Sequence, residues 1–161
     1  MSRPVRRTLA AVMLLLAGTL AAAVPARADS GTPALTNIRT GNNPGFDRIV
    51  LDLSAGNPPG TLSYQLTDEL TADPSGEIVW LTGQYFINVS AFAAVAHDQN
   101  GNPTYPGPQK FRTRNLGNVM AVAVTGDFES ALNIGLGVRT RTAVNVFTLT
   151  APNRIVIDVA H

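Results

Sequence analysis

The sequence predicts an all-β domain, an antiparallel β-sandwich of about eight short strands. Apolar runs and runs of alternating apolar and polar residues recur along the chain, with Gly, Pro, Asn and Asp between them. Beyond the N-terminal leader, no segment has the apolar periodicity of a helix of normal length. One strand-like motif, Arg-Ile-Val-(Leu/Ile)-Asp-(Leu/Val), occurs twice, at 48–53 and 154–159. A partly open β-barrel is the alternative architecture.

The first 28 residues have the pattern of a secretory signal peptide. A segment with three arginines precedes an apolar run over 9–24, and Ala26-Arg27-Ala28 then supplies a small-residue cleavage site. The run is short for a membrane span and leads directly into that site, so we expect secretion and no membrane anchor after cleavage.

The predicted mature chain consists of a short flexible lead-in, 29–34, and a single domain, 35–161. Four of the twelve basic residues leave with the signal peptide, so eight remain against eleven acidic residues and the net charge becomes −3. This balance excludes the basic surface of a nucleic-acid-binding or anionic-membrane-binding protein. The chain has no cysteine, so the domain depends on its buried core rather than on disulfides.

The doubled motif predicts one strand pairing and its register. Arg48 and Asp52 lie on the same face of a strand but about 13 Å apart, so they cannot pair with each other. If the two copies are antiparallel with Val50 opposite Val156, every arginine faces an aspartate, whereas a parallel pairing sets arginine against arginine. The predicted pairs are Arg48 with Asp158 and Asp52 with Arg154. Alternatively, the two strands are independent and their charges face solvent.

The other strands follow from local patterns. Alternating or continuously apolar segments are expected as strands at 35–39, 62–66, 78–81, 85–96, 119–125, 132–138 and 144–149. Within 85–96 the Ala-rich end could instead form a helical turn. Asp73-Pro74-Ser75-Gly76 fits a type I turn joining two antiparallel strands. The stretch 97–115 is the longest turn-rich segment, and loops of this length are either functional or disordered.

Three stretches identify the family that the sequence resembles. They are Gly45-Phe46-Asp47-Arg48-Ile49-Val50-Leu51-Asp52, then Gly126-Asp127-Phe128-Glu129, and finally Pro152-Asn153-Arg154-Ile155-Val156-Ile157-Asp158-Val159-Ala160-His161. With these marks the chain resembles the AMIN-like domain proteins of the actinobacterial cell envelope, over nearly the whole predicted mature region. The resemblance implies a small β-sandwich that acts as a non-catalytic envelope-targeting module, with peptidoglycan as the implied ligand.

Few residues could carry catalysis. Asp127 and Glu129 would share a face of a strand, and a carboxylate pair is what a small glycoside hydrolase needs. The simpler interpretation is an acidic turn with Phe128 in the core. A hydrolytic triad would need His97 or His161, and no Gly-x-Ser-x-Gly motif accompanies them.

A metal site is only weakly indicated. Asp98, Asn100 and Asn102 copy the start of a calcium loop, but Pro103 replaces its glycine, so a plain turn is the better interpretation. We expect no metal and no cofactor.

Binding has better candidates. Tyr105 offers an aromatic face, and Lys110, Arg112 and Arg114 offer cations for sugar rings and peptide carboxylates. Asn133, with Gly135 and Gly137, could form a flat polar floor for a glycan. The alternatives are a solvated loop for the first group and tight packing under another strand for the second. Trp80 and Tyr85 are expected in the core.

These observations favour a secreted, wall-associated module that binds peptidoglycan or a wall glycan without catalysis. The alternatives are a protein-interaction module whose long loop recruits an envelope protein, and the glycoside hydrolase considered above.

Overall fold

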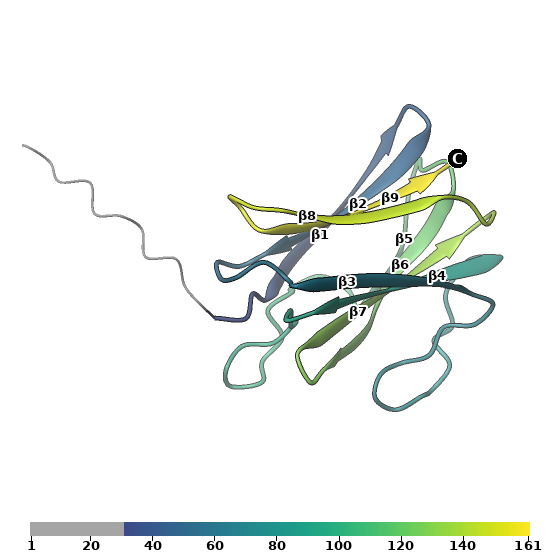
Figure 1. Ribbon diagram of the computed structural model, residues 1–161. Helices are drawn as coiled ribbons and strands as arrows, with labels where there is room; N and C mark the ends of the chain where they lie inside the picture. The colour runs from purple at the N-terminus through teal and green to yellow at the C-terminus, as the bar shows by residue number, and fades with distance from the viewer. Residues whose placement is uncertain (1–30) are drawn as a thin grey trace, which may run out of the picture.

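The computed structural model describes residues 31–161, and the predicted signal peptide lies outside these described residues. Within them the chain forms nine strands and no helix, arranged as two antiparallel sheets stacked face to face (Figure 1). The first sheet has the order β1-β2-β9-β8, with β1 Leu35–Asn43, β2 Phe46–Leu53, β9 Arg154–Ala160 and β8 Val144–Leu149. The second has the order β3-β4-β7-β6-β5, with β3 Thr61–Thr67, β4 Tyr85–Phe92, β7 Ala131–Val138, β6 Val119–Phe128 and β5 Lys110–Arg112.

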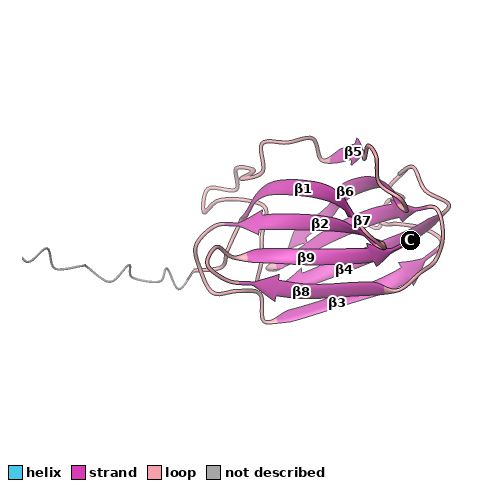
Figure 2. Cartoon of the chain, turned by 90° about the horizontal axis from the view of Figure 1, so that it is seen from above, coloured by secondary structure: helices cyan, strands magenta, loops and turns pink. Residues whose placement is uncertain are grey.

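The predicted sandwich is therefore confirmed, and the partly open barrel is not formed by the described residues. Seen from above, the strands of both sheets run in similar directions, as in aligned sandwiches (Figure 2). No helix long and apolar enough to cross a membrane occurs between residues 31 and 161.

The register predicted from the doubled motif is confirmed. β2 and β9 are antiparallel neighbours with Val50 opposite Val156. Arg48 lies opposite Asp158, and its guanidinium binds that carboxylate through two hydrogen bonds of 2.7 Å. Asp52 also lies opposite Arg154 as predicted, but its carboxylate is held by Arg39 of β1 at 2.6 and 2.7 Å. A central strand has two neighbours, and here the second neighbour supplies the partner.

The core lies between the two sheets. Alternate residues of β2 and β9, such as Ile49 and Ile157, point inward and are fully buried. They pack against inward residues of β4 and β7, such as Ile87 and Leu136. Burying such side chains stabilises the fold by about 1.5–3 kcal/mol each, which explains how a chain without disulfides holds together.

The long turn-rich segment is part of the fold, neither a free loop nor a disordered one. It is bonded to β1, since Thr104 Oγ1 donates to Leu35 O at 2.7 Å. Tyr105 is buried in the core at 7% exposure, and its burial raises the pKa of its phenol. The role of Tyr105 as a ligand-binding aromatic stays a prediction, and its place in the core leaves little of the ring exposed to a ligand.

Two strand predictions also need correction. β4 ends at Phe92, because Ala93 has φ +64° and leaves the sheet. The expected strand at 78–81 is reduced to one bridge between Thr71 and Ile78. β5 was not predicted, because its three residues follow a Pro-rich run.

The reversal at 73–76 also differs from the expected type I turn. Gly76 N donates to Ala72 O at 2.7 Å, so the turn starts one residue earlier, and the peptide bond before Pro74 is cis. The segment does double back, with Ala72 N donating to Glu77 O at 2.8 Å.

Candidate ligand-binding face

The segment between β3 and β4 lies across the outer face of the five-stranded sheet and shapes the candidate site. Two glycines of β7 make this close approach possible. A Cβ at Gly137 would stand 2.0 Å from Thr82 O, and one at Gly135 would stand 2.7 Å from Leu70 Cδ1. Leu70 is buried at 2% exposure under this cover. The bare face of β7 is thus filled by tight packing, the alternative to a glycan floor.

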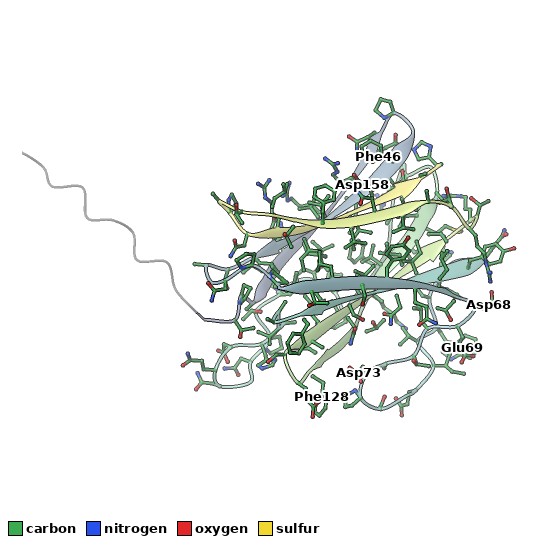
Figure 3. The ribbon with its side chains drawn as sticks, viewed as in Figure 1. Phe46, Asp68, Glu69, Asp73, Phe128 and Asp158 are labelled. Carbon is green, nitrogen blue, oxygen red and sulfur yellow. The ribbon has the colours of Figure 1, made fainter. Side chains whose placement is uncertain are left out.

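Asn133 belongs to the same covered face. It is buried at 8% exposure, its Nδ2 donates to Asp73 Oδ2 at 3.1 Å, and its Oδ1 accepts a hydrogen bond from Ser90 Oγ. The role of Asn133 in ligand binding stays a prediction, and in the structure its amide fastens the crossing segment to the sheet. Figure 3 shows Asp73 in this segment, beneath the five-stranded sheet.

The crossing segment carries Trp80 to the margin of the sheet beside β5. The expectation that Trp80 is a core residue is wrong, since it is 79% exposed. Lys110 Nζ donates to Trp80 O at 3.4 Å, and Arg112 Nε donates to Thr82 Oγ1 at 3.1 Å. Tyr85, by contrast, is partly buried against the core as expected.

Two adjoining hollows run along this margin. One of about 250 Å³ is lined by Trp80, Leu81, Thr82, Lys110, Phe111, Arg112 and Ala121. The next, of about 240 Å³, is lined by Thr82, Arg112, Thr113, Met120 and Arg139. Because Thr82 and Arg112 line both, we treat them as one feature and name it the Trp80 groove, marked by Trp80, Thr82, Lys110, Arg112 and Arg139.

The cations of the groove keep their charge uncompensated. Among the described residues, no carboxylate forms an ion pair with Lys110, Arg112, Arg114 or Arg139. Arg139 instead donates to the carbonyls of Leu116 and Gly117. Arg114 is exposed just beyond β5. Of the predicted cations, Lys110 and Arg112 thus flank an exposed tryptophan, which replaces the buried Tyr105 as the available aromatic.

The family model described as AMIN-like domain matches residues 33–161. The chain belongs to the AMIN-like domain family. Its resemblance to that family, carried by the doubled motif, is thereby confirmed. Comparison with curated proteins and with solved structures gave no match. Membership indicates a module related to the cell envelope, outside the cytoplasm.

The first family mark of this AMIN-like domain contains a buried carboxylate that sequence reasoning did not single out. Asp47 is fully buried and accepts hydrogen bonds from the backbone N–H groups of Gly117, Asn118 and Val119 at 2.6–2.8 Å. Asn118 in turn donates to Ala160 O at 3.0 Å. Asp47 therefore ties β2 to the turn before β6 and to the end of β9. An aspartate at a position that should face the core was the available signal.

Asp127 and Glu129 do not share the face of one strand. Glu129 lies in the turn after β6 with φ +49°, so strand alternation has ended before it. Asp127 Oδ2 lies 2.6 Å from His97 Nδ1, a contact between two segments that the sequence did not connect. Phe128 is 44% exposed, not in the core, and Figure 3 shows it at the β6–β7 turn.

The candidate metal-binding residues form a turn. The Asp98 carboxylate accepts hydrogen bonds from Asn102 Nδ2 and from the backbone of Asn100 and Asn102, which lower its pKa. Within residues 31–161, no three His, Cys, Asp or Glu side chains come together in a group that could hold a metal ion.

Proposed function

We propose that this AMIN-like protein is an exported, non-catalytic module that binds peptidoglycan, or a glycan attached to it, through the Trp80 groove. The observation that carries the proposal is an exposed tryptophan flanked by cations that form no ion pair with a carboxylate of residues 31–161. Export is supported by the signal-peptide pattern of residues 1–28.

The groove suits the two chemical parts of peptidoglycan. The indole of Trp80 presents a large flat apolar surface on which the apolar face of a sugar ring can stack. Lys110 and Arg112 stand beside it and can bind the carboxylates of a peptide stem, because charge-assisted hydrogen bonds are among the strongest available. Neither cation must first break an ion pair with another described residue in order to do so.

The recruiting-loop alternative has less support. Its loop is anchored to β1, and its aromatic residue Tyr105 is buried. The hydrolase alternative would need two carboxylates facing one cleft, whereas Asp127 contacts His97 and Glu129 lies in a turn.

Co-sedimentation with purified, insoluble peptidoglycan tests the proposal. The protein should enter the pellet at about 0.1 M salt, and less of it at about 1 M, where exposed charges are screened within about 3 Å. Trp80→Ala should raise the peptidoglycan needed for half retention at least about tenfold. Phe92→Ala, which removes another exposed aromatic outside the groove, is the matched control and should bind normally.

Peptidoglycan prepared with and without its attached polymers separates the two ligand sources. Retention only when the polymers are present identifies them as the ligand, and retention on both identifies the peptidoglycan itself. No retention on either material at any salt concentration would overturn wall binding.

A further inference from the structure

The two sheets have four edge strands, and they are protected unequally. Free edges invite pairing with another chain, and natural proteins protect them with charges, bulges or short length. β5 has only three residues, two of them cations. β1 contains Arg39 and a bulge between Leu35 and Asn37. β3 and β8 contain no charged residue, no proline and no bulge.

β3 is also apolar where it is exposed. Its alternate residues Leu62, Tyr64 and Leu66 lie on the face turned toward the other sheet. Tyr64 is 46% exposed and Leu66 is 39% exposed, although both are placed like core residues of the neighbouring strand. Figure 2 shows β3 at the margin of the molecule, with β8 beside it. The edge is therefore both free and incompletely covered.

The sequence of β3 is nearly the same in both directions. Thr-Leu-Ser-Tyr-Gln-Leu-Thr reads outward from Tyr64 as one polar residue, then leucine, then threonine, on each side. In an antiparallel pair of two such strands centred on Tyr64, like would meet like at every position. The resulting pairs are Tyr64 with Tyr64, Ser63 with Gln65, Leu62 with Leu66 and Thr61 with Thr67. Aromatic, threonine and apolar cross-strand pairs are favourable.

We propose that β3 pairs with β3 of a second copy of this chain, about a two-fold axis that passes midway between the two copies of Tyr64. The symmetry is isologous, as in most protein dimers. Because the pairing is centred on a residue, each core-facing residue of one copy lies opposite a core-facing residue of the other. The core-facing sides of both copies therefore lie on the same side of the joined sheet. Each Leu66 then gains a leucine neighbour, and each Tyr64 gains a tyrosine. No charged residue of either strand is buried by the pairing.

The outer-face positions Ser63 and Gln65 provide a test of this register. Both side chains are exposed and face away from the core, so the fold should tolerate changes there. The double variant S63K/Q65K sets lysine against lysine in both cross-strand pairs. The matched control S63K/Q65E alters the same two positions but sets lysine against glutamate.

Sedimentation velocity between about 10 µM and about 500 µM measures the outcome. The unchanged protein and S63K/Q65E should dimerise, whereas S63K/Q65K and S63E/Q65E should each remain monomeric. Mixing these two monomeric variants should restore a dimer, because every pair is then lysine with glutamate. A monomeric unchanged protein would overturn the proposal, as would a dimer that persists in S63K/Q65K. Circular dichroism of each variant checks that it is folded.

Discussion

The outer face of the four-stranded sheet and the Trp80 groove both present arginines, but they use them differently. On the sheet, Arg39 binds Asp52 and Arg48 binds Asp158, each through two hydrogen bonds. In the groove, Lys110 and Arg112 donate to neutral oxygens and form no ion pair within the part of the chain that the structure describes. The first set of charges is neutralised within the protein, and the second set remains available to an external anion.

Neighbouring aromatics reinforce the contrast. The Arg48 guanidinium lies 5.1 Å from the ring centre of Phe46 and 5.8 Å from that of Phe147, so it is covered as well as paired. Figure 3 shows Phe46 and Asp158 together on this sheet. Trp80 stands exposed among its cations. The lesson is that a cation's partner, rather than its residue type, separates a structural arginine from a binding one.

The largest effect on stability should come from a change at Asp47, a residue of β2 in the four-stranded sheet. Asp47→Asn removes the charged acceptor of three N–H groups, two of them buried, and turns an amide toward them. We expect the free energy of unfolding to fall by about 3 kcal/mol, measured by urea denaturation. Peptidoglycan retention by the folded variant should be unchanged. Asn37→Ala, an exposed change on β1, is the control, and a loss below about 1 kcal/mol for Asp47→Asn would contradict its anchoring role.

Smaller effects should distinguish Arg48 from Arg112: one substitution should lower stability and the other should weaken peptidoglycan binding. Arg48→Ala leaves the Asp158 carboxylate, only 17% exposed, without its partner and should lower the free energy of unfolding by about 1–2 kcal/mol, with normal peptidoglycan binding. Arg112→Ala should do the reverse, weakening binding severalfold while changing stability by less than about 0.5 kcal/mol.

Arg154→Ala is the matched control for the lost charge in both cases, since Arg154 lies outside the groove and forms no ion pair among the described residues. If Arg48→Ala and Arg112→Ala had equal effects on both measurements, the division of roles would be wrong.

The smallest effect should be a pH dependence from Asp52. Hydrogen bonds from Arg39 lower the pKa of this carboxyl below its usual range. A lowered folded-state pKa adds stability that is complete above the usual pKa near 4, and this stability is lost as the pH falls through the lowered value. Since Arg39 is half exposed, the contribution should be below about 1 kcal/mol and should shrink in salt.

Urea denaturation at pH 6 and at pH 3 measures the contribution of Asp52 to the free energy of unfolding. Asp52→Asn should lose less stability between the two values than the unchanged protein does. Equal losses would mean that the pairing with Arg39 contributes nothing.

The parts of the fold that local pattern determines could be predicted from the sequence. The register of β2 against β9 followed from complementary charges and apolar alternation, and it holds. The partner of Asp52 did not follow, because a central strand has two neighbours and the motif describes only one of them.

Residues between strands were harder, because packing across the molecule decides their burial. Trp80 and Tyr105 exchanged their expected roles: one lies on a segment outside the sheet, and the other on a segment that closes the core. Gly135 and Gly137 of β7 did carry a signal of this packing, because a strand face without side chains lets another segment of the chain approach closely. The contact of His97 with Asp127 had no sequence signal, because it joins two distant segments.

The position of β9 in its sheet limits how early the first sheet can form during synthesis. Of the nine described strands β9 comes last in the chain, yet it lies between β2 and β8, and Arg48 binds Asp158, which follows it by 110 positions. Until residues 154–160 have left the ribosome, the first sheet lacks the strand that joins β2 to β8. The nascent chain therefore cannot complete this sheet during the synthesis of the first 153 residues.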